Sequence, residues 1–350
     1  MRLNIKLIFF YDYLKRSLSL LENSNFSVLI HCVLFLGCFS KKVVKSQIIL
    51  RFIGIFWVVI PVLINVAFFT LLERKILGLR QLRKGPNKTG VVGILQPFAD
   101  AVKLFIKEAL LPTQSHKRLF FLPPTLALFI VLLIWWVCPR LRGHVRFRYR
   151  VAVFLIFLAL NVYPLFFAGW CSNRKYAIVG RTRGIAQSIS YEIRLSLFLL
   201  SVLCIAHRLQ LRSVFFSGLS SYTPIAAPVV VFWMVCCVAE TNRSPFDFAE
   251  GESELVSGFN IEYGAGGFAL IFMAEYARIL ALSYIRGLII FSTSLIGAET
   301  ITILAMAFFW VWLRCTYPRF RYDKLILLAW KHILPIRLRI CGVFIPLRVL

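Results

Sequence analysis

Long apolar runs separated by basic or polar stretches follow one another along the chain from residue 48 onward. A helix that crosses the roughly 30 Å hydrocarbon core of a bilayer needs about 20 predominantly apolar residues. The runs are continuous and lack the period-two alternation of barrel strands, so they predict membrane helices. We assign them to Ile48–Leu72, Leu119–Val137, Val151–Trp170, Ile185–Ala206, Pro224–Val238, Gly264–Leu282, Leu288–Leu313 and Leu325–Val343.

Composition leads to the same class of protein. Hydrophobic residues make up 59% of the 350 positions and charged residues only 16%. A soluble domain of this length lacks the interior needed to hide so much apolar surface. We therefore expect an all-α, polytopic membrane protein with about eight transmembrane helices plus interfacial amphipathic helices.

The first 47 residues differ from the rest of the chain. Their longest apolar stretch, Phe26–Phe39, is short for a span, and the pattern favours an interfacial segment or a short anchor. A targeting peptide is a third possibility, but Asp12, Glu22 and the lack of a clear cleavage site count against it. The chain is thus divided into a peripheral or interfacial extension at 1–47 and a membrane domain at 48–350.

A basic loop joins the first two apolar runs. Its Gly85-Pro86-Asn87 sequence stops a helix. From Ala99 to Glu108, apolar and charged residues then recur at roughly helical spacing. This pattern predicts an amphipathic helix that lies along the membrane interface without crossing it.

The formal net charge is +26. Most Lys and Arg residues lie between apolar runs, where they suit anionic lipid headgroups such as those of cardiolipin, and neighbouring subunits. The sequence contains no helix-turn-helix, zinc-finger or RNA-binding aromatic signature, so we expect no nucleic acid partner. Its nine cysteines and five histidines show no ligand spacing, so we expect no metal and no redox centre in this chain.

Acidic residues are concentrated in one segment, 239–263. The chain has 15 Asp and Glu residues, and this segment contains six of them: Glu240, Asp247, Glu250, Glu252, Glu254 and Glu262. Ser244-Pro245-Phe246-Asp247 has the signature of a helix N-terminus, which predicts a helix from Pro245 to about Ser257. On such a helix Asp247, Glu250 and Glu254 share one face, and Glu252 points elsewhere.

Two further acids, Glu192 and Glu275, lie inside neighbouring apolar runs. Ionisable groups within a membrane are unfavourable and usually mark an ion or proton path. Clustered carboxylates cannot all stay ionised in a low dielectric, so some of them take up and release protons near neutral pH. We predict a proton relay with Arg183 and Arg243 as counter-charges; a solvated acidic loop is the alternative.

Seven segments between Ile48 and Ile340 resemble one known family, in order and without large gaps. They are LLERKILGLRQLRKGPNKTG, LQPFADAVKLFIKE, GWCSNRKYAIVG, AQSISYE, AETNRSPFDFAEGESELVSGFNIEY, FMAEYARI and YPRFRYDKL. Together they are similar to subunit 1 of respiratory NADH:ubiquinone oxidoreductase, complex I. Residues 1–47 lie outside the resemblance.

The resemblance implies eight transmembrane helices at the junction of the hydrophilic and membrane arms. It implies partners among the core subunits of both arms, with accessory subunits near residues 1–47. Ubiquinone is the substrate, in a tunnel shared with neighbouring subunits, whereas NADH, FMN and iron–sulfur clusters belong to partner subunits. The implied location is the mitochondrial inner membrane, with a bacterial plasma membrane as the alternative.

Functional positions follow from the matching motifs. Positions associated with the quinone tunnel are Glu73, Arg74, Arg83 and Asp100; we expect Arg83 and Asp100 to lie near its entrance as a pair. Proton-linked positions are Glu192, Glu240, Glu275 and the acids between 247 and 262. Arg243 matches the family's T-N-R motif. Arg319 and Arg321 match the basic pair before the last helix and are interpreted as a contact for the arm subunits.

Three arginines depart from the family pattern. Arg194 stands two residues after Glu192, where the family usually has an uncharged residue. Arg278 follows Glu275 by three positions, and Arg181 is an additional cation beside Arg183. They either lower the pKa of nearby acids or face lipid headgroups and accessory subunits, and the sequence leaves both readings open.

The leading hypothesis is therefore an enzyme subunit without its own cofactor, which couples quinone reduction to proton translocation. A homologous membrane subunit of a hydrogenase-type complex is the first alternative, since it would keep the acids without needing ubiquinone. A secondary transporter is the second, although the internal repeat with paired broken helices that such proteins usually show is absent from the sequence.

Overall fold

The computed structural model describes residues 58–109, 111–138, 150–206, 223–248, 260–291 and 296–339, together with Gly342. The chain divides into two units, 1–57 and 58–350, and every described residue belongs to the second. The predictions for the extension at 1–47 and for Glu250, Glu252 and Glu254 therefore lie outside the described residues.

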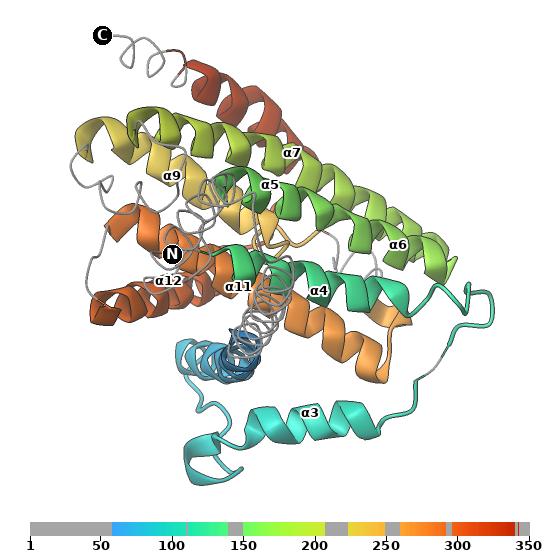
Figure 1. Cartoon of the computed structure of the whole chain (residues 1–350). Coiled ribbons are helices and arrows are strands. Elements are labelled where there is room, and N and C mark those ends of the chain that lie inside the picture. Colours follow the sequence, from blue (N-terminus) through green and yellow to red (C-terminus); the bar gives the residue numbers. More distant parts are fainter. Residues whose placement is uncertain are drawn as a thin grey trace, which may run out of the picture. The chain divides into compact units, whose positions relative to one another are not determined.

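The described part of the chain contains helices and connecting loops but no strands, as predicted (Figure 1). A helix at 58–80 comes first. The others are η1 (Val91–Gly93), α3 (Gln96–Ile106), α4 (Leu122–Val137), α5 (Arg150–Leu160), α6 (Val162–Ser172), α7 (Lys175–Ala206), α9 (Thr223–Glu240), η3 (Asn260–Glu262), α11 (Ala265–Phe291), α12 (Ile296–Thr316), α13 (Tyr322–Leu327) and the π-helical η4 (Leu328–Ile333).

Two stretches in the described part are long and apolar enough to cross a membrane, Arg150–Ser172 and Ala265–Gly287. Three shorter apolar helical stretches are Leu122–Val137, Val231–Glu240 and Ile303–Thr316. The structure thus identifies two candidate spans where the sequence predicts about eight.

Helix α11 is central to the packing. It packs against α4 on one side and α12 on another, and it also contacts α3. Helix α7 packs against α6 and α9, which completes the bundle around a shared apolar core (Figure 1). Within that core the rings of Phe198 and Trp233 stack with centroids 4.7 Å apart.

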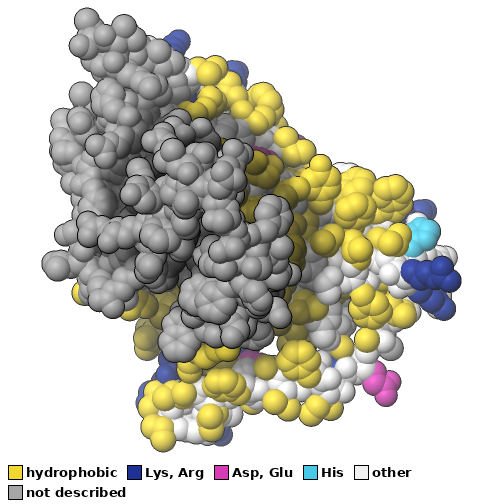
Figure 2. All heavy atoms as spheres, viewed as in Figure 1, with side chains coloured by type: hydrophobic (Ala, Val, Ile, Leu, Met, Phe, Trp, Pro, Cys, Tyr) yellow, Lys and Arg dark blue, Asp and Glu magenta, His cyan; other side chains and the backbone are white. Residues whose placement is uncertain are grey.

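Apolar side chains also cover much of the outer surface. Figure 2 shows them spread over the described part of one face. On α4, α5 and α6 they include Phe129, Ile156, Tyr163 and Trp170, all more than half exposed. Such an exterior suits contact with lipid or with other subunits better than contact with water.

The amphipathic segment predicted after the Gly-Pro turn is helix α3. It starts at Gln96 with Pro97 in its first turn, where the missing N–H of proline has no intrahelical partner to lose. The Phe98 ring packs edge-on against Phe68 of the helix at 58–80, with centroids 6.1 Å apart. Phe105 remains 67% exposed, so α3 keeps an apolar face free of contacts within the described chain.

The helix predicted to start at Pro245 does not form there. Residues 241–248 are turns and irregular backbone, and residues 249–259 lie outside the described part. The reason is that other segments bind this backbone: the Gln187 amide donates to the carbonyl oxygens of Ala239 and Phe246 at 2.9 and 2.8 Å. The Phe320 N–H likewise donates to Pro245 O at 3.0 Å. These tertiary hydrogen bonds override the local capping signal.

Candidate functional site

A buried carboxylate, Glu73, lies near the end of the helix at 58–80 and is only 6% exposed. It accepts hydrogen bonds from the Tyr276 hydroxyl of α11, at 2.5 Å, and from the Arg314 guanidinium of α12. Burial alone raises the pKa of Glu73. The charges of Arg243 and Arg314 and the hydrogen bonds from Tyr276 and Arg314 outweigh it and hold the pKa below its usual value. Glu73 is therefore an ionised carboxylate shared by three helices.

Arg243, in the loop after α9, extends this cluster. Its Nη2 lies 3.6 Å from Glu275 Oε2, and its guanidinium stacks over the Tyr276 ring at 4.5 Å. The side chain is almost completely buried. A continuous polar network therefore runs from Glu73 through Tyr276 and Arg243 to Glu275, and it joins a predicted tunnel residue to a predicted relay acid.

The remaining tunnel candidates lie at the α3 end of the molecule. Asp100 on α3 pairs with Arg74 at 2.5 Å and accepts a second hydrogen bond from Gln96 at 2.9 Å. Arg83 instead donates to Gln81 at 2.9 Å. The expected pairing of Arg83 with Asp100 is therefore wrong. Arg74 is the partner because it sits where α3 approaches the helix at 58–80, whereas Arg83 follows that helix in the turn.

Three predicted relay acids lie on adjacent helices around α11. Glu240 ends α9 and is 2% exposed, and it is close enough to Glu192 on α7 to interact electrostatically. Arg278, one helical turn beyond Glu275, interacts electrostatically with both Glu240 and Glu275. The structure therefore brings Glu192, Glu240 and Glu275 into one connected group of charges.

Two other acids have partners elsewhere. Asp247 pairs with Arg319 at 3.4 Å, and Glu262 lies 4.0 Å from Arg174. Arg319, predicted as an arm contact, thus also binds within the chain. Its companion Arg321 pairs with Asp323 at 3.0 Å on the exposed surface.

Of the two predicted counter-charges, Arg243 contacts a relay acid directly. Arg183 stacks over the Tyr322 ring at 5.9 Å. The extra cation beside it, Arg181, donates to the carbonyl oxygen of Phe166 at 3.0 Å and stacks on that ring. The two neighbouring arginines therefore contact aromatic residues of different segments.

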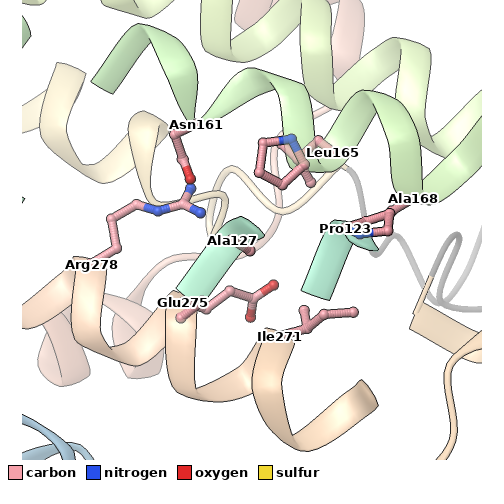
Figure 3. A pocket seen from close by; sticks show the side chains of 10 residues that line it. Pro123, Ala127, Asn161, Leu165, Ala168, Ile271, Glu275 and Arg278 are labelled. Atoms are coloured by element: carbon pink, nitrogen blue, oxygen red, sulfur yellow. The ribbon is translucent and has the colours of Figure 1, made fainter. Parts of the chain in front are cut away.

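A small cavity of about 20 Å³ lies between α4, α6 and α11 (Figure 3). Glu275, Arg278 and Asn161 supply its polar groups, and the Glu275 carboxylate points into it. Asn161 Oδ1 is buried without a hydrogen-bond partner among the described residues. The space suffices for about one water molecule, and these groups could bind it.

Sequence reasoning missed Tyr276, Arg314 and Asn161. Tyr276 lies in the FMAEYARI segment directly after Glu275, and Arg314 follows the seventh apolar run. Asn161 is a polar residue inside the apolar run Val151–Trp170, and a polar residue in such a run is itself an indication of a functional position.

Among the described residues, no cluster of His, Cys, Asp and Glu could hold a metal ion. Five cysteines in the described part of the chain are free thiols: Cys138, Cys171, Cys236, Cys237 and Cys315.

In the described part of the chain, an all-helical bundle with an apolar exterior encloses connected carboxylates and arginines. This arrangement is typical of helical proteins that hold ionisable groups in a low-dielectric interior. Residues 53–345 match the family described as NADH dehydrogenase, and the chain belongs to that family. The family resemblance stated from the motifs is thereby confirmed.

Proteins named NADH-ubiquinone oxidoreductase chain 1 are similar over nearly their whole length. The one from Aedes aegypti is 46% identical over 308 residues, which is 86% of this chain and 97% of the relative. The one from Branchiostoma lanceolatum is 46% identical over 294 residues, 83% and 93% of the two chains. The one from Monodelphis domestica is 44% identical over 302 residues, 83% and 94%.

Proposed function

We propose that this chain is the core membrane subunit of proton-pumping NADH:ubiquinone oxidoreductase that forms the membrane side of the quinone tunnel. Its relatives from animals support a location in the mitochondrial inner membrane. About eight transmembrane helices, as the apolar runs predict, are part of the proposal. Its partners are the core subunits of both arms, accessory subunits near residues 1–47 and anionic lipids such as cardiolipin. NADH, FMN and the iron–sulfur clusters belong to the partner subunits.

The observation that supports coupling is the network between Glu73 and Glu275. The Tyr276 hydroxyl binds Glu73, and Arg243 both covers the Tyr276 ring and lies 3.6 Å from Glu275. In an interior that screens charge poorly, a change of charge at one end of such a network alters the field at the other end.

The tunnel end of the network faces the substrate. Reduction of ubiquinone to the quinol consumes two electrons and two protons, and the electrons come from the partner subunits. When protons are drawn toward the headgroup, the charge balance around Glu73 changes. Arg243 then shifts between its two contacts, and the affinity of Glu275 for a proton changes in turn.

The entrance is formed by α3 beside the helix at 58–80. The Arg74–Asp100 pair and the Phe68–Phe98 contact hold the two helices together. The exposed apolar side chains of Val102, Phe105 and Ile106 provide a surface along which an isoprenoid tail can slide from the bilayer.

Purification of the assembly that contains this chain tests the assignment. An affinity tag on the chain should recover FMN, iron–sulfur clusters and NADH:ubiquinone reductase activity in one large complex. Recovery of the chain in a complex that evolves hydrogen, or as a free carrier without cofactors, would contradict the assignment.

A further inference from the structure

Two arginines lie completely buried inside the bundle, and no carboxylate among the described residues forms an ion pair with either of them. Arg194 of α7 and Arg286 of α11 are both 0% exposed. None of the three guanidinium nitrogens of Arg194 has a hydrogen-bond partner among the described residues, and the Arg286 guanidinium interacts there with the Cys237 thiol instead of a carboxylate. The buried Arg243 at the site contrasts with them, since it pairs with Glu275, and the partly exposed Arg314 pairs with Glu73.

The neighbours of the two arginines are aromatic rings and a thiol. The Arg194 guanidinium lies 4.7 Å from the Tyr191 ring and 5.6 Å from the Trp330 ring. The Arg286 guanidinium lies 4.4 Å from the Trp310 ring, beside the Cys237 thiol. Ring faces and a thiol stabilise a cation far less than burial destabilises it. An arginine cannot be deprotonated to escape this penalty.

A serine would satisfy both positions. Within a helix a serine hydroxyl donates to a carbonyl oxygen one turn earlier, so it needs no outside partner. These same helices already hold such serines close by. Ser196 of α7 donates to Ile193 O, and Ser283 of α11 donates to Leu280 O, both at 2.7 Å.

A difference between genetic codes can place serine at these positions. The mitochondrial codes of invertebrate animals read AGA and AGG as serine and AUA as methionine, whereas the standard code reads arginine and isoleucine. The printed chain has 41 Lys and Arg against 15 acids, and only four methionines. Translation of such a gene with the standard code would give arginine in place of serine and isoleucine in place of methionine. It would therefore produce both the excess of basic residues and the low number of methionines.

We propose that positions 194 and 286 are decoded as serine in the assembled protein. The inference rests on the mitochondrial location within the proposed function and goes beyond it. It also gives a reason why Arg194 departs from the family pattern. Serine at these positions removes two positive charges from the interior that holds Glu192 and Glu240.

The codons and the mature peptides test the inference together. The gene should have AGA or AGG at positions 194 and 286 but a CGN codon at Arg243, because the Arg243–Glu275 pair requires a cation. In a tryptic digest of complex I purified from the organism's mitochondria, one peptide should run uncut from Gly184 to Arg208, with serine at position 194. A chymotryptic digest should show serine at position 286. Cleavage after Arg243 is the control.

Arginine in the mature peptide at position 194 or 286 would overturn the inference and leave the proposed function standing. Serine at position 243 as well would also overturn the inference. An ion pair with a carboxylate would then not distinguish the positions decoded as arginine from those decoded as serine. If the chain is missing from purified complex I but present in another complex, the proposed function fails, and the peptides from that complex still decide the inference.

Discussion

The Tyr276 hydroxyl donates a hydrogen bond to Glu73 Oε2 at 2.5 Å, although the two residues are 203 positions apart in the chain. The bond is one of the interactions that keep the pKa of Glu73 below its usual value despite burial. It also links α11, which carries Glu275, to the helix that carries the proposed tunnel residues Glu73 and Arg74. The first prediction follows from this bond.

Tyr276→Phe removes the hydroxyl but keeps the ring under Arg243. The pKa of Glu73 should then rise. On acidification, the Glu73 carboxylate should therefore become protonated at a higher pH than in the unchanged protein. A hydrogen bond to a charged group is worth about 1.5–3 kcal/mol, so the acid limb of quinone reduction should move to higher pH. The pH profile with a hydrophilic artificial acceptor is the control and should not move; an unchanged quinone profile would exclude Glu73 as the titrating group.

Arg314→Met should destabilise the assembled subunit. It leaves the buried Glu73 carboxylate without its guanidinium hydrogen-bond partner, a change that costs about 3–5 kcal/mol for fully buried pairs. Arg314 is about a third exposed, so about 2 kcal/mol is the expected loss. The measure is the temperature at which quinone reductase activity is lost.

Arg321→Met is the matched control for Arg314→Met. Its partner Asp323 and Arg321 itself are mostly exposed, and such pairs contribute about 0–1 kcal/mol. An equal loss of thermal stability in the two variants would mean that the Glu73–Arg314 pair contributes no more to stability than an exposed pair.

Asp100→Asn should weaken the attachment of α3 and raise the KM for ubiquinone. Exposed pairs contribute about 0.2–1 kcal/mol, so the expected rise is up to about fivefold. Arg83→Ala should have a smaller effect, because the Arg83 side chain donates to Gln81, two positions earlier in the same turn. A larger effect of Arg83→Ala than of Asp100→Asn would contradict this geometry of the entrance.

Glu240→Gln and Glu192→Gln should lower the number of protons pumped per NADH while the complex still assembles. Both substitutions keep the side-chain shape and remove the group that exchanges a proton. Pumping is measured in sealed vesicles against NADH oxidation. Normal stoichiometry in both variants at normal assembly would remove these acids from the relay.

Much of the fold is predictable from hydropathy, and the failures have physical causes. The run Leu119–Val137 predicts α4 within three residues, because Arg118 and Pro139 bound the apolar segment that contains the helix. Helix α7 begins at Lys175, well before the predicted Ile185, because Lys and Arg are good helix formers that hydropathy ignores. The capping signal at Ser244 fails because Gln187 and Phe320 bind that backbone instead.

The candidate site is predictable only as a list of charges. Glu73, Glu240 and Glu275 stand out because acids are rare in apolar runs. Their partners do not, since the Glu73–Arg314 and Glu73–Tyr276 contacts span 241 and 203 residues and arise from the packing of three helices. Residue spacing carries no information on such distant pairs.

The central claim is that Arg243 couples the tunnel to the relay, and proton pumping in Arg243→Gln tests it most directly. Sealed vesicles with equal subunit content should keep full NADH oxidation with an artificial hydrophilic acceptor. Quinone reduction should fall, and the protons pumped per NADH oxidised should fall with it. Arg243→Lys, which keeps the charge, should recover part of both. A normal ratio of protons to NADH in Arg243→Gln, at whatever rate, would contradict the coupling role.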